Sequence, residues 1–250
     1  MTAKSADQDH SNIWKVVKVV PENNDINSLY LEGSDEKFTH RKAGQFASLM
    51  IMRPDGWSEA HSFSISCAPE DPLLHLTIKK VGAFTSAIPD LQSGTPVKCI
   101  GPLGVFCRDI ELNPVIVMIA GGVGIAPFLS VLRHFRNIKA GNKVTLFWVN
   151  KTIDDAFSSD EIGGMTRDIN LTAVYCLSRE DDAQRYLQQR YPRVLYENGR
   201  LSGDIMKRRG VTEDAAYYLC GPSPMMEATL KELGSINVDQ SAVQQEKFSW

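Results

Sequence analysis

The sequence has few cysteines and no closely spaced pair among them. They are odd in number, widely separated and without a C-x-x-C motif: Cys67, Cys99, Cys107, Cys176 and Cys220. The five histidines are scattered as well. Zinc sites and iron–sulfur clusters take closely spaced cysteine or histidine ligands. This spacing therefore predicts no metal site and no cluster on the chain.

An excess of positive charge is also missing. The formal net charge is −3, with 43% hydrophobic and 23% charged residues. Nucleic acids and anionic membrane surfaces favour basic partners, so neither is expected. Residues 1–12 are polar and have no apolar core of a secretory signal, so we expect a flexible tail there. The lack of a secretory signal, together with free thiols, favours a cytoplasmic protein.

Only one long apolar run exists, over residues 115–132. It is nearly long enough to cross a bilayer, which takes about 20 residues. The segment "IAGGVGIAP" at 119–127 interrupts it with three glycines and Pro127, which would break a lipid-exposed helix. A membrane span is therefore disfavoured, and no transmembrane segment is predicted.

A better interpretation of this run is a strand, a glycine turn and a helix. The strand covers 115–120, and the helix begins near Ala126 with Pro127 in its first turn. Its apolar residues share one face at helical spacing: Phe128, Val131, Leu132 and Phe135. Bare backbone amides at such a helix start bind phosphate, although a glycine turn can also serve only close helix packing.

The chain divides into two halves with different hydrophobic periods. The first half, up to about residue 110, alternates apolar and polar residues in six candidate strands, at 13–20, 26–32, 45–52, 61–66, 73–79 and 95–101. In one of them, Leu74, Leu76 and Ile78 point one way and their neighbours the other, which predicts a half-buried antiparallel strand. Six such strands and a short helix after Thr85 indicate a closed or nearly closed barrel.

The second half, after Pro114, alternates buried strands with helices. The strands are expected at 115–120, 144–149, 171–177 and 215–221, and the helices near 126–137, 181–191 and 224–234. This alternation predicts a parallel sheet with ligands at the carboxyl ends of its strands. "AGGVGIAP" and "CGPSPMM" both follow such ends, so two glycine-bearing loops would line one crevice suited to a dinucleotide.

Six motifs in order resemble the ferredoxin-NADP reductase superfamily across residues 13–250. They are "HSFSIS", "VGAFTS", "GPLGVF", "AGGVGIAP", "CGPSPMM" and "EKFSW". The resemblance implies a six-stranded antiparallel FAD-binding barrel over 13–112 and a parallel-sheet NAD(P)-binding α/β domain over 113–250. It also implies that the glycine turn holds the pyrophosphate of NADPH or NADH.

The flavin motif departs from the family pattern Arg-x-Tyr-Ser. His61, Ser62, Phe63 and Ser64 occupy it, with His in place of Arg and Phe in place of Tyr. This version is similar to the His-Pro-Phe-Thr of ferric reductases and NADPH oxidases, with Ser62 in place of proline. A neutral histidine offers one donor where arginine offers five, so we expect weaker pyrophosphate contact and loosely held FAD.

Further cofactor contacts follow from the resemblance. Gly82 and Thr85 match the Gly-x-x-Ser/Thr turn that binds flavin phosphates, although Thr85 also fits an ordinary N-cap. Other residues expected beside the flavin are Thr77, Ile78, Lys79, Ala83, Phe84, Phe248 and Trp250. Trp250 resembles the terminal aromatic residue that covers the flavin in some members, and a frayed chain end is the alternative.

The nucleotide side carries a second set of implied contacts. The residues expected there are Gly122, Gly124, Ile125, Pro127, Cys220, Gly221 and Pro222. Cys220 matches the family cysteine near the nicotinamide, and a buried strand-end thiol is the alternative. Lys151, Ser178 and Arg179 follow the second and third strands, where NADPH-using relatives hold the 2′-phosphate. They slightly favour NADPH over NADH, with plain surface charge as the alternative.

The resemblance implies that NAD(P)H gives a hydride to FAD, with the catalytic residues Ser64, Cys220 and Glu246 shaping the site. The flavin then passes single electrons to ferredoxin, flavodoxin, a haem protein, a ferric chelate or oxygen. A basic strip at 207–209 with Arg133, Arg136 and Lys139 is a candidate surface for an acidic carrier, and plain surface charge is the alternative. The alternative function is an electron-transfer subunit with little activity alone.

Overall fold

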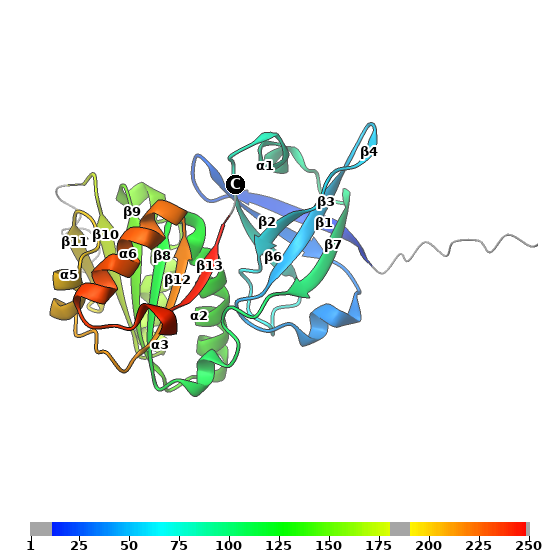
Figure 1. Cartoon of the computed structure of the whole chain (residues 1–250). Coiled ribbons are helices and arrows are strands. Elements are labelled where there is room, and N and C mark those ends of the chain that lie inside the picture. The colour runs from blue at the N-terminus through cyan, green and yellow to red at the C-terminus, as the bar shows by residue number, and fades with distance from the viewer. Residues whose placement is uncertain (1–11, 181–190, 249–250) are drawn as a thin grey trace, which may run out of the picture.

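A computed structural model describes residues 12–180 and 191–248 and contains two β-sheet units side by side (Figure 1). The first unit is antiparallel. Its strands are β1 (Ile13–Pro21), β2 (Ile26–Glu32), β3 (Phe46–Arg53), β4 (Gly56–Trp57), β5 (His61–Ser64), β6 (Leu74–Lys79) and β7 (Pro96–Leu103). The short β4, which the sequence did not predict, forms a hairpin with the end of β3.

Six of these strands close into a barrel. Their order is β5-β3-β7-β1-β2-β6, and an isolated bridge between Ile65 and Leu76 joins the two ends of this row. The alternating apolar residues fill the interior, where Leu29, Leu49 and Val97 are fully buried. The predicted six-stranded antiparallel barrel is confirmed.

Strand β6 is buried on both faces, which corrects the expectation that one face meets solvent. Leu74, Leu76 and Ile78 point into the barrel core as predicted. His75 and Thr77, on the other face, are only 4% and 3% exposed. The reason is that this face packs against other protein groups, among them the ring of Tyr30 and the side chain of Arg133.

The second unit is a parallel sheet in the order β11-β10-β9-β8-β12-β13. Its strands are β8 (Val115–Gly121), β9 (Lys143–Asn150), β10 (Leu171–Leu177), β11 (Val194–Asn198), β12 (Ala216–Gly221) and β13 (Gln244–Lys247). The predicted parallel sheet is confirmed, and β11 and β13 are additional strands. Two helices expected from the sequence are present, α2 (Ala126–Ile138) and α6 (Ser223–Ser235), whereas the one expected near 181–191 lies almost wholly outside the described residues.

Helices cover both faces of the parallel sheet. The core on one side combines β8 and β10 side chains with α2 and α3 (Ser159–Asp168), and the core on the other side combines the same strands with α5 (Gly203–Arg208) and α6. In Figure 1, α2 lies on the side of the sheet that faces the barrel. Every β8 residue after Val115 is buried, which explains its continuous apolar sequence.

The order in which strands are added to the sheet reverses between β8 and β12. From β8 the chain builds β9, β10 and β11 on one side, and then returns to place β12 and β13 on the other side. In such sheets, ligands bind at the carboxyl ends of the strands at this reversal. The turn after β8 and the loop after β12 meet there, as the sequence predicted.

The apolar run at 115–132 is divided as expected. Strand β8 ends at Gly121, a 3₁₀ turn covers Gly122–Ile125, and α2 begins at Ala126 with Pro127 in its first turn. No helix in the described part of the chain is both long and apolar enough to cross a membrane.

Candidate functional site

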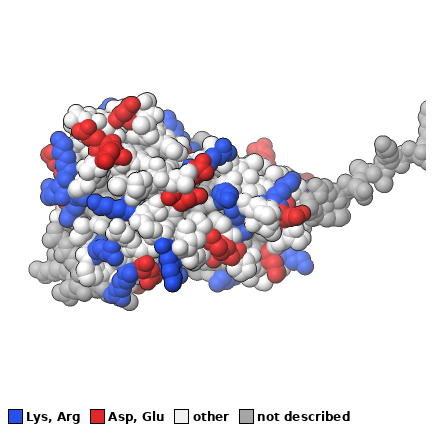
Figure 2. Space-filling view, turned by 90° about the horizontal axis from the view of Figure 1, so that it is seen from below, with Lys and Arg blue, Asp and Glu red and all other residues white. Residues whose placement is uncertain are grey.

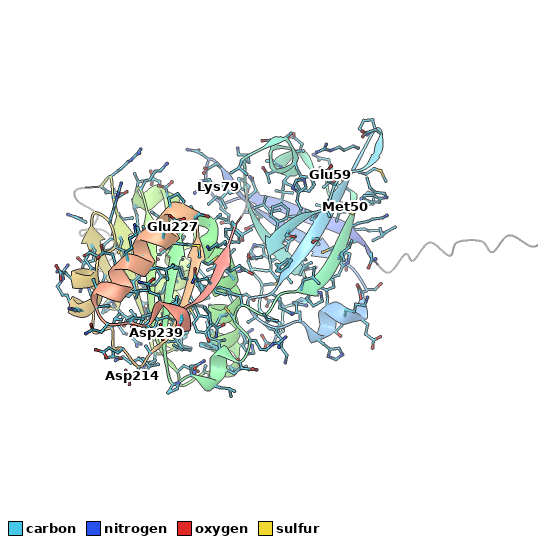
Figure 3. The ribbon with its side chains drawn as sticks, in the orientation of Figure 1. Met50, Glu59, Lys79, Asp214, Glu227 and Asp239 are labelled. Atoms are coloured by element: carbon cyan, nitrogen blue, oxygen red, sulfur yellow. The ribbon has the colours of Figure 1, made fainter. Side chains whose placement is uncertain are left out.

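A cavity of about 500 Å³ lies where the barrel meets the parallel sheet. Its walls come from β5, the end of β6, the turn into the short helix α1 (Ala83–Ser86), the start of α2 and the residues after β13. Lys79, at the end of β6, marks this boundary in Figure 3, whereas Asp214 and Asp239 lie at the opposite end of the parallel sheet. Segments distant in sequence therefore share one site.

Three aromatic rings form a wall of this cavity. The His61 ring stacks on Phe84 with centroids 4.0 Å apart and planes 29° apart. Phe63 lies nearly parallel to Phe84, at 5.9 Å and 19°. His61 and Phe63 share one face of β5 because side chains alternate along a strand. The rings provide a surface on which a planar aromatic group can stack.

A hydroxyl and a carboxylate lie buried at the same site. Ser64 is 4% exposed, and neither Ser64 Oγ nor Glu246 Oε2 has a hydrogen bond of ordinary geometry within the described residues. Burial raises the pKa of Glu246 to about 7, and the nearby Ser64 hydroxyl offsets part of this rise. Glu246 does not line the cavity, whereas Ser64 does, so the Ser64 hydroxyl is the one that can take a partner from a ligand there.

Glu246 reaches the site on a strand that the sequence did not predict. Strand β13 pairs in parallel with β12, with Glu246 opposite Cys220. Its sequence QQEK has no apolar alternation, because β13 is a polar edge strand with exposed positions. The motif near the chain end was thus recognisable although the strand carrying it was not.

The turn before α1 is open on its outer side. A Cβ added at Gly82 would meet no atom within 4 Å. The Thr85 hydroxyl accepts hydrogen bonds from the backbone N–H groups of Val81 and Gly82 and donates to the Gly82 carbonyl. Thr85 is the N3 residue of α1 and Gly82 is the N-cap, so the alternative of an N-cap threonine is wrong, and the Thr85 hydroxyl bonds within its own turn.

The glycine turn after β8 is closely packed on one side. A Cβ added at Gly124 would lie 2.3 Å from the Cys220 carbonyl oxygen. Gly122 has a φ of +52°, a Cβ added there would meet nothing within 4 Å, and its carbonyl accepts a bond of 2.9 Å from Trp148 Nε1. Gly124 thus serves close packing, whereas Gly122 leaves open space beside the turn.

The loop after β12 packs against the same turn, and its cysteine is not exposed to the cavity. Gly221 has a φ of +155°, and a Cβ there would lie 3.0 Å from the Gly121 backbone. The thiol of Cys220 is fully buried, and burial raises its pKa well above the ordinary value. The thiol has the buried strand-end environment that the sequence analysis gave as the alternative, and Cys220 belongs to the core of the sheet.

The remaining predicted site residues of the barrel and of the glycine turn divide between cavity and core. Those in the cavity wall are His61, Ser62, Phe63, Ser64, Thr77, Lys79, Gly82, Ala83, Phe84, Thr85 and Phe248. Ile78 and Ile125 instead point into the two cores, because their strand and turn bury those faces, and any contact they make with a ligand would be through the backbone. Trp250 lies outside the described residues.

Sequence reasoning missed five residues of the cavity wall. They are Ala60, Val81, Val123, Ala126 and Lys247, each next to a motif residue that was recognised. Most are small or apolar side chains, which carry no chemical signal in a sequence. Val81 is 52% exposed, an unusual environment for a valine that a ligand in the cavity would cover.

The residues expected near a 2′-phosphate come together at the ends of β9 and β10. The Arg179 N–H donates to the Lys151 carbonyl at 2.8 Å, and the Ser178 N–H donates to the Asn150 carbonyl at 3.1 Å. The side chains of Lys151, Ser178 and Arg179 are exposed. Asn150, which the sequence analysis did not select, is 6% exposed with its amide unpartnered in the described residues.

Part of the predicted basic strip is paired with acidic neighbours, while Lys207, Arg136 and Lys139 are exposed. Arg208 and Arg209 both bind the carboxylate of Glu197, at 2.6 and 2.5 Å. Arg133 is bound to Glu161. On the face shown in Figure 2, basic and acidic side chains are interspersed rather than gathered by sign. These arginines are thus held by acidic neighbours within the fold.

The fold and the cavity define a class of protein with a flavin-type barrel joined to a nucleotide-type parallel sheet. A sequence model described as the oxidoreductase NAD-binding domain matches residues 118–231. The reductase component of propane 2-monooxygenase from Mycolicibacterium goodii is 32% identical over 242 residues, covering 94% of this chain and 67% of the relative. The chain thus spans about two thirds of that relative's length.

Two solved structures have the same fold. The flavohem-like FAD/NAD-binding domain of nitric oxide dioxygenase from Vibrio cholerae O1 biovar El Tor has a TM-score of 0.79 at 20% identity, covering 95% of this chain and 98% of that one. A ferredoxin NADP⁺ reductase from Neisseria gonorrhoeae with bound FAD and NADP has a TM-score of 0.71 at 18% identity, with 94% and 97% covered. The chain belongs to the ferredoxin-NADP reductase superfamily of NAD(P)H-dependent FAD oxidoreductases.

Proposed function

We propose that this protein transfers a hydride from NADPH or NADH to FAD and passes the electrons singly to a separate acceptor. The observation that carries the proposal is the wall of three stacked rings with the buried Ser64 hydroxyl beside it, in one cavity between the two sheets. A planar heteroaromatic group with polar ring atoms fits both features. Bound FAD would supply the two-electron to one-electron conversion that this activity needs.

The residues of the chain have distinct roles in this proposal. Phe63, with His61 and Phe84, stacks against the flavin and excludes water, and Ser64 offers a hydroxyl to its polar edge. Glu246, whose pKa is raised to about 7 by burial, can hold or release a proton near neutral pH. The open space at Gly82 and Gly122 lets the phosphates of the two cofactors approach the backbone of these turns.

NADPH is the preferred nucleotide in this proposal. Lys151, Ser178 and Arg179 are exposed together at the strand ends, where they can contact a 2′-phosphate with two cations and a hydroxyl. Cys220 acts only through its backbone, because its thiol is buried. A cytoplasmic location is also part of the proposal, because all five cysteines are free thiols, as is usual in a reducing compartment.

The acceptor is proposed to be a protein carrier such as ferredoxin, flavodoxin or a haem protein. Relatives are named as the reductase component of propane 2-monooxygenase and as flavohemoproteins, and a reductase component by its name serves another component. This chain has no cysteine spacing for a cluster of its own. A separate acceptor is therefore the simpler arrangement.

The decisive experiment uses the purified chain reconstituted with FAD. We expect a yellow protein that is bleached by NADPH and, more slowly, by NADH, and that reduces ferricyanide or a tetrazolium dye. A colourless protein that neither binds FAD nor oxidises either nucleotide would contradict the proposal. Phe63→Ala should lose flavin binding, whereas Glu227→Gln, an exposed position on α6, should not.

A second candidate is an electron-transfer subunit that turns over slowly unless docked to an oxygenase. The naming of several relatives as reductase components favours it. The same assay separates the two: a free-standing reductase reduces the dye and a protein acceptor rapidly on its own. A subunit is reduced by the nucleotide but passes electrons on slowly, and accelerates only with its partner.

A further inference from the structure

One face of α2 is polar and contacts the barrel. Ser130, Arg133, His134 and Asn137 recur at spacings of three and four residues, so they share one helix face. We refer to these four residues as the α2 stripe. The apolar face of the same helix, recognised in the sequence, packs on the parallel sheet. The α2 stripe is therefore free to face the other unit.

Each member of the α2 stripe bonds to the segment that connects β5 and β6. The Ser130 hydroxyl donates to the Cys67 carbonyl at 2.6 Å. His134 and Asn137 both contact the carboxylate of Glu70, at 2.6 and 3.1 Å. Helix α2 is thus attached to the barrel over two helical turns.

Arg133 makes the most extensive of these contacts. Its Nη1 donates to the Ser66 carbonyl at 2.6 Å and lies 3.2 Å from His75 Nδ1, both on the barrel. Its Nε and Nη2 bind the two oxygens of Glu161 on α3, each at 2.7 Å. A bidentate pair of this kind fixes the orientation of the guanidinium plane. Burial and the Arg133 charge lower the pKa of His75 to about 3, so its ring stays neutral and accepts.

The contacts join the two parts of the proposed site by a short path. The turn Gly122–Ile125 lies immediately before α2, and the aromatic residues His61 and Phe63 lie on β5, a few residues before Ser66. A rotation of α2 relative to the β5–β6 connection would therefore move the nucleotide turn relative to the ring wall. Reacting atoms in hydride transfer must approach to about 3–3.5 Å, and a 1 Å error costs roughly 100-fold.

We propose that Arg133 is a positioning residue that clamps the nucleotide-binding turn against the flavin-binding wall. It sets the alignment for hydride transfer rather than the affinity for either cofactor. The proposal rests on the proposed function, because it concerns the same transfer step. The guanidinium of Arg133 bonds to Ser66, His75 and Glu161, so it acts through these residues and not on a reacting group.

The test compares three variants. Arg133→Met removes the clamp but leaves Glu161 half-buried without its partner, which can destabilise the fold. Arg133→Met/Glu161→Met removes both charges and so avoids that penalty, while still lacking the bonds to the barrel. Arg136→Met, one turn of α2 later, is the matched control. Arg136 is exposed, and its ion pair with Asp168 is long, at 4.0 Å.

The first measurement is the rate of FAD reduction at saturating NADPH, followed by stopped flow. We expect the double variant to reduce FAD at least about tenfold more slowly than the wild type, with a nucleotide Kd within about twofold. The Arg136→Met control should match the wild type in both. A double variant reduced at the wild-type rate, or slowed only through a raised Kd, overturns the proposal.

The second measurement needs no cofactor. Spin labels at Glu59→Cys on the barrel and Glu227→Cys on α6 occupy exposed positions on the two units (Figure 3), and the five native cysteines are buried. We expect one narrow distance distribution in the otherwise wild-type chain and a broader one in the double variant. An unchanged distribution overturns the clamp. If the wild-type chain fails to oxidise any nucleotide, the proposed function fails, and this measurement still decides whether the clamp exists.

Discussion

Two glycine turns border the cavity, and they contain glycine for different physical reasons. At Gly82, on the barrel side, an added Cβ would meet nothing within 4 Å. At Gly124, on the sheet side, it would lie 2.3 Å from the Cys220 carbonyl oxygen. Both turns resemble phosphate loops in the sequence. Only the structure separates a glycine that keeps space open for a ligand from one that lets two loops of the protein touch.

The largest expected effect separates these two roles directly. Gly124→Ala places a methyl group against rigid backbone, so we expect a loss of about 3 kcal/mol in the free energy of unfolding. Urea denaturation of the cofactor-free protein measures it. Gly141→Ala, where a Cβ meets nothing within 4 Å, is the matched control and should change stability by less than about 0.5 kcal/mol. Equal stability of the two variants would refute the packing role of Gly124.

The second effect concerns Glu246, which lies opposite Cys220 where β13 pairs with β12. Burial raises its pKa from 4.5 to about 7 in the folded chain, so between these values the folded state binds more protons than the unfolded state. The stability supplied by this group is therefore complete below pH 4.5 and is lost as the pH rises to 7, by about 3 kcal/mol.

Glu246→Gln should remove that loss. The measurement is the wild-type minus variant difference in unfolding free energy across about pH 4 to 8, without cofactors, so that other carboxylates cancel. Glu227→Gln, at an exposed position, serves as the control and should leave the wild-type profile unchanged. A difference that does not depend on pH would show that Glu246 titrates normally.

The third effect concerns Gly82, in the turn before α1. Gly82 has an extended backbone that any residue adopts, so Gly82→Ala should leave stability within about 0.5 kcal/mol of wild type. If bare amides of this turn contact the flavin phosphates, the methyl group should weaken FAD binding about tenfold, or about 1.4 kcal/mol. Fluorescence titration of the apoprotein with FAD measures it. Unaltered affinity would remove this turn from the site.

The smallest effect tests the proposed contact between Arg179, after β10, and the 2′-phosphate of NADPH. Arg179→Ala should raise the KM for NADPH about fivefold, because one exposed charge-assisted contact to the 2′-phosphate is worth about 1 kcal/mol. The KM for NADH should stay the same. Arg193→Ala, an exposed arginine just before β11, provides the control. A parallel rise for both nucleotides would point to a general effect on the sheet instead.

The sequence predicted the regular part of both units well. Residues of β1, β6 and β8 carry their burial pattern in their apolar spacing, and Pro127 marked the start of α2. Strands β4 and β13 escaped because two residues, or a polar edge, leave no hydrophobic pattern. The helix α3 escaped because its sequence SDEIGGMTRD contains two glycines, which lower helix propensity.

Site residues could be predicted where they belong to a recognisable motif. They could not be predicted where residues distant in the sequence determine what a side chain contacts. His61 and Phe63 were found from their motif, but their stacking on Phe84 depends on how α1 folds over the barrel. The local sequence around Cys220 does not reveal whether its thiol faces a ligand or the core. Arg133 looked like surface charge, because nothing local reveals that Ser66 and Glu161 lie on either side of it.

Strand β13 has a practical consequence for handling the protein. It runs along the edge of the parallel sheet and delivers Phe248 into the cavity wall. A tag or fusion joined close behind Phe248 would therefore begin beside the cavity and obstruct it. A cleavable tag on the amino-terminal side avoids this obstruction.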